Sequence, residues 1–325
     1  DQDFVAPYRA GQIGDLDSLW TERLLAVSIE AVTYGHQLTG DVAYLTAATE
    51  LVTTAYRHIT GDASNLAEIN PGAPSFPPQD CFIHTAGQAA EGDADDPWCS
   101  GWMPALLVDP LLSYQTQTGD PQVDEIFIRL TRYLRDTGSA YFDPEDGNAD
   151  DTFLTPRDPF DPSETENPRV LVPLYGAGLD EGGERLNSGE YDDYLHCLDV
   201  TGITAAGIRA LQRSGVYDLN PIGPFASEGE SFLALHQEFA FCAEWTQADQ
   251  TRLHRDPATW SAEDLAEGLD DPATFIGDNN IGNSSHHVSP ARKISWWFNP
   301  ALGQFALPQE AGVAIPELQP GSVEP

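Results

Sequence analysis

The strongest constraint on the fold is a turn that recurs between helical patterns. The chain reads Tyr-Gly-His-Gln-Leu-Thr-Gly-Asp at 34–41 and Tyr-Gln-Thr-Gln-Thr-Gly-Asp at 114–120, and Gly61-Asp62 repeats the last two letters. Glycine suits the left-handed residue that ends a helix, and the aspartate after it accepts from the first N–H groups of the next helix. Each motif therefore predicts two helices joined by a tight turn.

The segments around these turns have helical periodicity. In the helix predicted after the first turn, Tyr44, Leu51 and Ala55 fall on one face. Gly215 ends a later pattern, and Pro300 interrupts the last one. The segments predicted as helices are 20–38, 42–60, 101–118, 121–136, 190–213, 228–245 and 295–305. Strand patterns are scarce, and the best is a short one at 169–172.

Three polar connections, 62–97, 137–187 and 246–292, are too long for simple bundle turns. Long loops on a helical scaffold usually build or cover a site. Hairpins that each contact the next predict an all-α fold, an (α/α) toroid or incomplete barrel of helical hairpins with long loops. We expect one domain over 1–315 and a proline-rich tail or linker over 316–325.

The two turn motifs resemble the helix-turn-helix repeats of bacterial (α/α) toroid proteins. The resemblance is architectural, closer over 18–136 than over 188–305, and no catalytic signature of one family accompanies it. Most members of this architecture are glycoside hydrolases and polysaccharide lyases. The resemblance therefore implies a carbohydrate-active enzyme whose partner is a polysaccharide or oligosaccharide.

The charge balance excludes other partners. The 325 residues carry 15 basic and 52 acidic side chains, a net charge of −37. Such a surface repels phosphate backbones and anionic lipids, so we expect no nucleic-acid and no membrane partner. Lys293 stands alone as lysine among the basic residues. An acidic, lysine-poor surface suits a salty medium, although a merely soluble surface or genome composition explains the same bias.

The four cysteines form no Cys-x-x-Cys pair, so a structural zinc site is not expected. Proximity in sequence favours the disulfides Cys81–Cys99 and Cys197–Cys242, one of three possible connectivities. Disulfides predict a secreted or periplasmic protein, and the first residue, Asp1, agrees with a processed chain. The alternative is four buried thiols in a cytosolic enzyme.

Four predicted helix starts combine aromatic rings with polar groups. Sugar rings bind to aromatic faces through their C–H groups, and helix N-termini favour a carboxylate ligand. The alternative is that the rings only attach loops to the core. The candidate substrate-binding aromatics are Trp20, Trp98, Trp102, Trp296 and Trp297.

Cations near these helix starts could bind an acidic sugar. Arg23 is the best candidate to hold a carboxylate with two hydrogen bonds, and Arg292 and Lys293 precede the last predicted helix. Asn280 resembles the asparagine that neutralises the uronate in toroid-type lyases. Ile281 follows it, where those lyases have histidine or an aromatic residue, so an asparagine-rich loop without a role is the competing interpretation.

His196 is the candidate general base. Asp193 and Asp199, three residues before and three residues after it, are each placed to fix its tautomer. The competing interpretation is a core histidine beside the Cys197 disulfide. Its sequence neighbours complete the catalytic candidates: Tyr191, Asp193 and Tyr194.

Carboxylates give a second possible chemistry. A hydrolase would draw an acid and a base from Glu22, Asp109, Asp193 and Glu238. No metal or other cofactor is expected. Segment 143–151 offers oxygen ligands for calcium, but its spacing departs from the EF-hand pattern, so a solvated acidic loop is favoured.

The sequence thus predicts a monomeric, exported enzyme that cleaves glycosidic bonds. We favour β-elimination on a uronic acid, in which His196 takes the C5 proton and Tyr191 or Tyr194 protonates the leaving oxygen. Arg23 or Lys293, with Asn280, would neutralise the carboxylate. The alternatives are the two-carboxylate glycoside hydrolase and a non-catalytic glycan-binding or scaffold protein.

Overall fold

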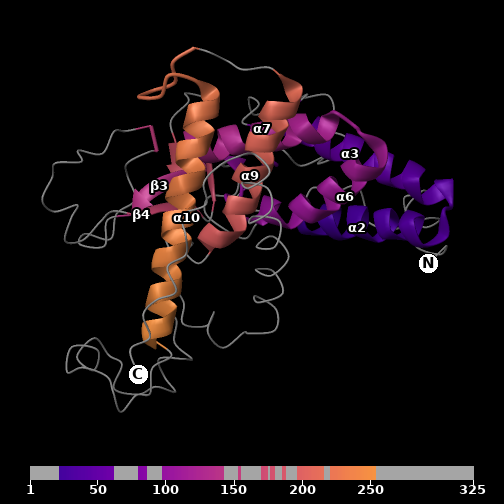
Figure 1. Ribbon diagram of the computed structural model, residues 1–325, viewed down its shortest axis with the longest axis horizontal. Coiled ribbons are helices and arrows are strands. Elements are labelled where there is room, and N and C mark those ends of the chain that lie inside the picture. Colours follow the sequence, from indigo (N-terminus) through magenta and orange to yellow (C-terminus); the bar gives the residue numbers. More distant parts are fainter. Residues whose placement is uncertain are drawn as a thin grey trace, which may run out of the picture.

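The computed structural model describes part of the chain, and this part is mostly helical, as the all-α prediction requires. The described residues are 22–61, 80–85, 97–142, 153–154, 170–174, 176–179, 185–187, 196–215 and 220–253. The predicted helix at 295–305, the tail at 316–325 and the acidic segment at 143–151 lie outside them. In Figure 1, α2, α3 and α6 lie on one side of the array and α10 on the other, with α7 and α9 between.

Three helical hairpins make up the array. They are α2 (Glu22–Thr39) with α3 (Val42–Ile59), α6 (Val108–Thr118) with α7 (Gln122–Asp136), and α9 (Cys197–Ser214) with α10 (Glu228–Leu253). The predicted helix at 101–118 begins instead with a 3-10 helix, η2 (Met103–Leu107). The helix predicted at 228–245 extends to Leu253, and the one predicted at 190–213 is described from Cys197.

The predicted turns are confirmed. Gly40 and Gly119 adopt the left-handed conformation, both with φ of 69°, and Gly215 does so at the end of α9. The Asp41 carboxylate accepts from the backbone N–H of Ala43 at 2.9 Å, and Asp120 does the same for Gln122 at 3.0 Å. Each aspartate thus satisfies one of the N–H groups at the start of the following helix.

The first helices of the hairpins meet at their N-terminal ends. Helix η2, which leads into α6, packs against both α2 and α9. Hydrogen bonds also join the far ends, with His36 Nδ1 2.6 Å from Gln117 Oε1 and Arg213 Nη2 donating to Gln115 Oε1 at 3.0 Å. The second helices contact one another in turn, α3 with α7 and α7 with α10. Closure of this array into a ring stays a prediction.

Short strands in the long connections lie where the first helices begin. Strand β4 (Val170–Pro173) confirms the strand predicted at 169–172 and pairs antiparallel with β3 (Ser139–Phe142). Two smaller antiparallel pairs are β1 (His84–Thr85) with β2 (Pro97–Trp98), and β5 (Ala177–Leu179) with β6 (Arg185–Asn187). The sequence patterns did not predict these five additional strands.

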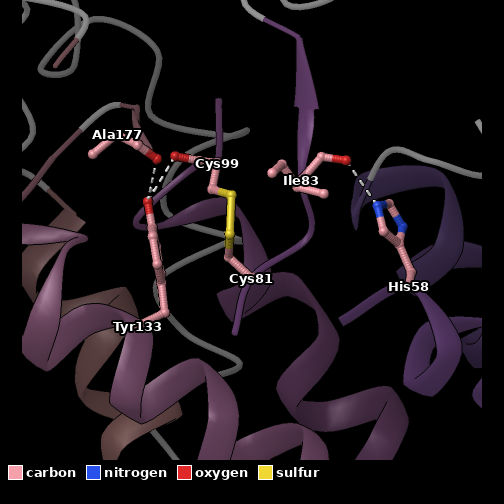
Figure 2. The surroundings of a disulfide bond; sticks show 6 residues. All are labelled: His58, Cys81, Ile83, Cys99, Tyr133 and Ala177. Atoms are coloured by element: carbon pink, nitrogen blue, oxygen red, sulfur yellow. Dashed lines mark hydrogen bonds between the residues drawn. A yellow bond between two sulfur atoms is a disulfide. The ribbon is translucent and has the colours of Figure 1, made fainter. Parts of the chain in front are cut away.

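Tyr133 anchors this region to α7. Its hydroxyl lies 2.8 Å from the carbonyl oxygen of Cys99 and 3.0 Å from that of Ala177 (Figure 2). The backbones of Cys99 and Ala177 also exchange two hydrogen bonds. Two distant connections are therefore held together above the C-terminal end of α7.

Both predicted disulfides are confirmed. Cys81–Cys99 joins the middle of the connection between α3 and η2 to its last residues, and Cys197–Cys242 joins the start of α9 to α10. One apolar core continues through all three hairpins and includes all four cysteines. Among the described helices, none is long and apolar enough to cross a membrane.

Candidate active site at the helix N-termini

Glu22 is the first residue of α2 and is buried, with 1% of its surface exposed. Among the described residues, neither of its carboxylate oxygens has a hydrogen-bond partner. Burial raises the pKa of Glu22 from 4.5 to about 8, and outweighs the opposing effects of its own backbone N–H and of Arg23. At neutral pH the side chain is therefore a neutral carboxylic acid, which can donate a proton.

His196 precedes the first residue of α9 and is paired with Asp199 in its first turn. Nδ1 lies 2.8 Å from Asp199 Oδ2, and both side chains are buried. Because a carboxylate accepts, Nδ1 carries the proton of the neutral ring and Nε2 carries the lone pair. This is the pairing by which a carboxylate orients a histidine base and stabilises the imidazolium.

Trp102 links this pair to the start of η2. Its indole stacks on the His196 imidazole, with the ring centroids 3.9 Å apart and the planes 7° from parallel. An indole face stabilises a cation that lies over it. The stack therefore favours the protonated ring that a histidine base forms during catalysis.

These groups share one end of the helical array. Glu22 begins α2, Trp102 precedes η2 and His196 precedes α9, and η2 packs against both neighbouring helices. Helix N-termini concentrate positive potential and N–H groups, which favour an anionic ligand. The arrangement brings an acid, a histidine–aspartate pair and anion-favouring backbone to the same end of the fold.

The remaining described candidates occupy different settings. Arg23 is exposed on α2, beside the buried Glu22. Trp98 is only 4% exposed and packs against Gly176, where an added Cβ would lie 2.0 Å from the indole. Trp102 is 5% exposed. The backbone of Gly176 therefore covers the Trp98 indole, and the His196 ring covers a face of the Trp102 indole.

Eight candidates lie outside the described residues, so the structure does not place them: Trp20, Tyr191, Asp193, Tyr194, Asn280, Lys293, Trp296 and Trp297.

Helices α2 and α6 carry two half-buried carboxylates, Asp109, which the sequence analysis named, and Glu30, which it missed. Burial raises the pKa of Asp109, and burial and then the charge of Asp109 raise the pKa of Glu30. Glu30 is therefore a carboxylate on which the charge of Asp109 acts. Glu238, another hydrolase candidate from the sequence, lies half-buried on α10. The available signal for Glu30 was a lone acid within the apolar run Leu-Leu-Ala-Val-Ser-Ile-Glu-Ala-Val.

Within the described part of the chain, no group of three or more histidine, cysteine, aspartate and glutamate side chains could hold a metal ion. No family model matches the chain, and the searches of the curated proteins and of the solved structures found no match either. The function must therefore be argued from the chemistry of the site.

Proposed function

We propose that the chain is an exported carbohydrate-active enzyme of the (α/α) toroid type that cleaves a uronic-acid-containing glycan by β-elimination. The observation that carries this proposal is the occurrence of a neutral, buried Glu22 and the His196–Asp199 pair at one end of the helical array. The two disulfides support export from the cytosol.

In the proposed reaction His196 Nε2 removes the proton from C5 of the uronate. The electron pair of the C5–H bond forms the C4–C5 double bond, and the C4–O bond breaks. Asp199 and the Trp102 ring stabilise the imidazolium that results. An acid must protonate the departing oxygen, and Glu22, Tyr191 and Tyr194 are the candidates.

Proton removal from C5 also requires neutralisation of the neighbouring carboxylate. The N-terminus of α2 supplies partial positive charge, and Arg23 follows Glu22 directly. Neutral Glu22 adds no negative charge that would oppose substrate binding at pH 7. Asn280 and Lys293 are the further candidates from the sequence for this role.

A specific observation favours a second candidate, hydrolysis by two carboxylates. Burial raises the pKa of Glu30 on α2 and of Asp109 on α6, and the charge of Asp109 raises the pKa of Glu30 further. Such a pair can divide the roles of acid and base between its members. Water would then add to the glycosidic carbon, and no unsaturated product would form.

The test incubates the full chain with a panel of uronate polymers and neutral glucans. Ultraviolet absorbance from unsaturated ends identifies the lyase, and new reducing ends without that absorbance identify the hydrolase. Retention on an immobilised glycan without any product identifies a binding protein. The last two outcomes each overturn β-elimination.

Variants assign the residues. We expect His196→Asn to lower kcat/KM by about 10²–10⁴-fold, the contribution usual for a general base. His36→Gln, at the opposite end of α2, is the matched control and should keep the parent activity. Circular dichroism and the urea midpoint establish that each variant is folded. Parent activity in folded His196→Asn would remove His196 from the mechanism.

A further inference from the structure

One face of α2 is apolar and open to solvent. Val27 is 55% exposed, Tyr34 47% and Leu38 86%, and Ala31 is exposed between them. These four residues follow the i, i+4, i+7, i+11 spacing that defines one side of a helix. We name them the exposed α2 face.

This face lies at an edge of the helical array. The opposite side of α2, with Leu25, Ile29 and Val32, is buried against α3, η2 and α6. Figure 1 shows α2 along the border of the array, with α6 and then α3 beyond it. Apolar side chains grouped on an open face, in a chain this acidic, indicate a surface that another segment covers.

The same chain contains a segment suited to cover it. Residues 294–308 read Ile-Ser-Trp-Trp-Phe-Asn-Pro-Ala-Leu-Gly-Gln-Phe-Ala-Leu-Pro, with no charged side chain, although the chain has 52 acidic residues. We name this stretch the aromatic segment. Two tryptophans and two phenylalanines in fifteen residues would lose much free energy if they stayed in water.

Charge supplies a second reason for this pairing. Arg292 and Lys293 directly precede the aromatic segment. Glu30 lies on α2 beside the exposed face and is electrostatically coupled to Asp109. No ion pair joins either acid to a cation within the residues the structure describes. The two cations would supply the missing positive charge.

The length of the chain permits the contact. The structure describes α10 as far as Leu253, and residues 254–291 connect this point to the two cations. An extended chain of that length reaches about 125 Å, whereas a helix of 26 residues such as α10 is about 39 Å long. The extended connection is therefore about three times as long as α10.

From these observations we infer that the aromatic segment docks on the exposed α2 face, with Arg292 and Lys293 against Glu30 and Asp109. Residues 292–308, near the end of the chain, would then pack against the first hairpin. The inference uses neither the substrate class nor the His196–Asp199 pair, so it and β-elimination can each fail alone. Docking would, however, occupy Lys293, leaving Arg23 and Asn280 to neutralise the uronate.

The single lysine makes a sharp experiment possible. A carbodiimide joins an amine to a carboxylate without a spacer, and Lys293 is the one lysine in the chain. We expect peptide mapping of the native full chain to recover Lys293 joined to Glu30 or Asp109. Lys293→Arg keeps the charge and should abolish these products. Coupling of Lys293 to other acids alone, or equal coupling in guanidinium, would overturn the inference.

A photocrosslinker on the face itself identifies the occupant. Benzoylphenylalanine in place of Leu38 should join residues 294–308 of the same chain, and the same replacement of Phe241, 41% exposed on α10, is the matched control. Capture of residues 1–21, capture of a second copy in a mixture of heavy and light chains, or no capture at Leu38 would each contradict it. The inference would also be contradicted if the photocrosslinker at position 241 captured residues 294–308 as efficiently as the one at position 38.

Discussion

Glu22 shows how position alone can change the chemistry of a side chain. The residue begins a helix, where a carboxylate is normally stabilised, yet burial dominates and raises its pKa to about 8. Protonation of Glu22 in the folded state therefore affects the free energy of unfolding, and the same proton is available for donation in the proposed reaction.

The first prediction concerns the pH dependence of stability. Between pH 4.5 and about 8 the folded chain holds the Glu22 proton and the unfolded chain releases it. This group's contribution is complete below pH 4.5 and falls with rising pH, by up to about 1.4 kcal/mol per pH unit. Glu22→Gln, which cannot ionise, should lose this slope.

The measurement is urea unfolding of both proteins from pH 5 to pH 9. The difference in free energy of unfolding should grow in favour of Glu22→Gln up to about pH 8 and then level off. Glu50→Gln, at an exposed site on α3, should run parallel to the parent protein. A constant difference across the range would show that Glu22 is already ionised at pH 5.

His58 gives the opposite dependence on pH. The ring is buried against Phe82, and Nε2 donates to the Ile83 carbonyl oxygen at 2.9 Å (Figure 2). Burial lowers the pKa of His58 to about 4, and a proton on Nδ1 would find no acceptor among the described residues. Stability from this group is present above pH 6.5 and is lost as pH falls toward 4.

The second prediction uses His58→Gln, an uncharged variant with an amide that can still donate. We expect it to be less stable than the parent by about 1–2 kcal/mol at pH 7, because the packing changes. The deficit should shrink between pH 6.5 and 4, since only the parent must exclude a proton. His36→Gln, at a part-exposed site, serves as the control in the same urea titration.

At the scale of elements, the hairpin turns are the part of the fold that local chemistry determines. Gly119 has φ of 69°, and a Cβ added there would meet no atom within 4 Å. A substitution at this position therefore tests the left-handed backbone without any packing change.

The third prediction is that Gly119→Ala lowers the free energy of unfolding by about 1 kcal/mol, with the slope of the urea transition unchanged. Gly119→Asn should lose less, because asparagine tolerates the left-handed region better than alanine. Equal losses for both variants would show that the turn relaxes to another conformation.

A buried charge cluster joins α7 to α10. Glu228, the first residue of α10, accepts from Arg132 at 2.6 and 3.0 Å and lies 3.6 Å from Arg135. Its side chain is 4% exposed, and the Arg135 side chain is 7% exposed. The two helices are thus joined where neither charge can be solvated on its own.

The fourth prediction follows from that burial. Glu228→Ala leaves Arg135 and Arg132 without their shared carboxylate, and we expect a loss of about 3 kcal/mol in the free energy of unfolding. Glu50→Ala on the exposed side of α3 should stay within about 0.5 kcal/mol of the parent. Urea titrations of the two variants measure these losses. If both variants lost a similarly small amount of the free energy of unfolding, water would reach the cluster.

The elements also show how far sequence patterns carry. Glycine, aspartate and the 3.6-residue period are local signals, so α2, α3 and α7 were predicted to within two residues at each end, and proximity predicted both disulfides. Helix α10 extends eight residues beyond its predicted end. The 3-10 start of α6 was missed, although Pro104 and Pro110 remove helical N–H donors there. Strand β3 was missed because its partner is distant in the sequence.

The candidate site was less predictable, because burial depends on distant contacts. The link between His196 and Asp199 is three residues long and was one of two expected, with Asp193 the other, but the stack with Trp102 was not expected. Glu30 has no local signal that places it opposite Asp109. The burial of Trp98 could not be predicted, because Gly176, which receives its indole, belongs to another connection.

At the scale of the whole molecule, the net charge of −37 acts on folding and on binding together. Mutual repulsion of the acidic side chains is smaller in the expanded unfolded chain, so it destabilises the folded state. It also opposes the approach of a polyanionic glycan, although the helix N-termini favour its carboxylates locally.

The fifth prediction is therefore that salt both stabilises the folded chain and accelerates the proposed reaction. The screening length falls from about 10 Å at 0.1 M to about 3 Å at 1 M salt. The urea midpoint should rise over this range, with NaCl and KCl equivalent at equal ionic strength. Initial rates of cleavage of a uronate polymer should also rise with salt concentration, whereas the rate of hydrolysis of a neutral glucan, if it occurs, should not.

Sucrose is the control, because it stabilises the folded state by exclusion from the protein surface and does not screen charge. It should raise the urea midpoint and leave the rate unchanged. A midpoint that is flat in salt would mean that the acidic side chains are too far apart, or too well solvated, to repel one another, and the lysine-poor surface would then need no salty medium to explain it.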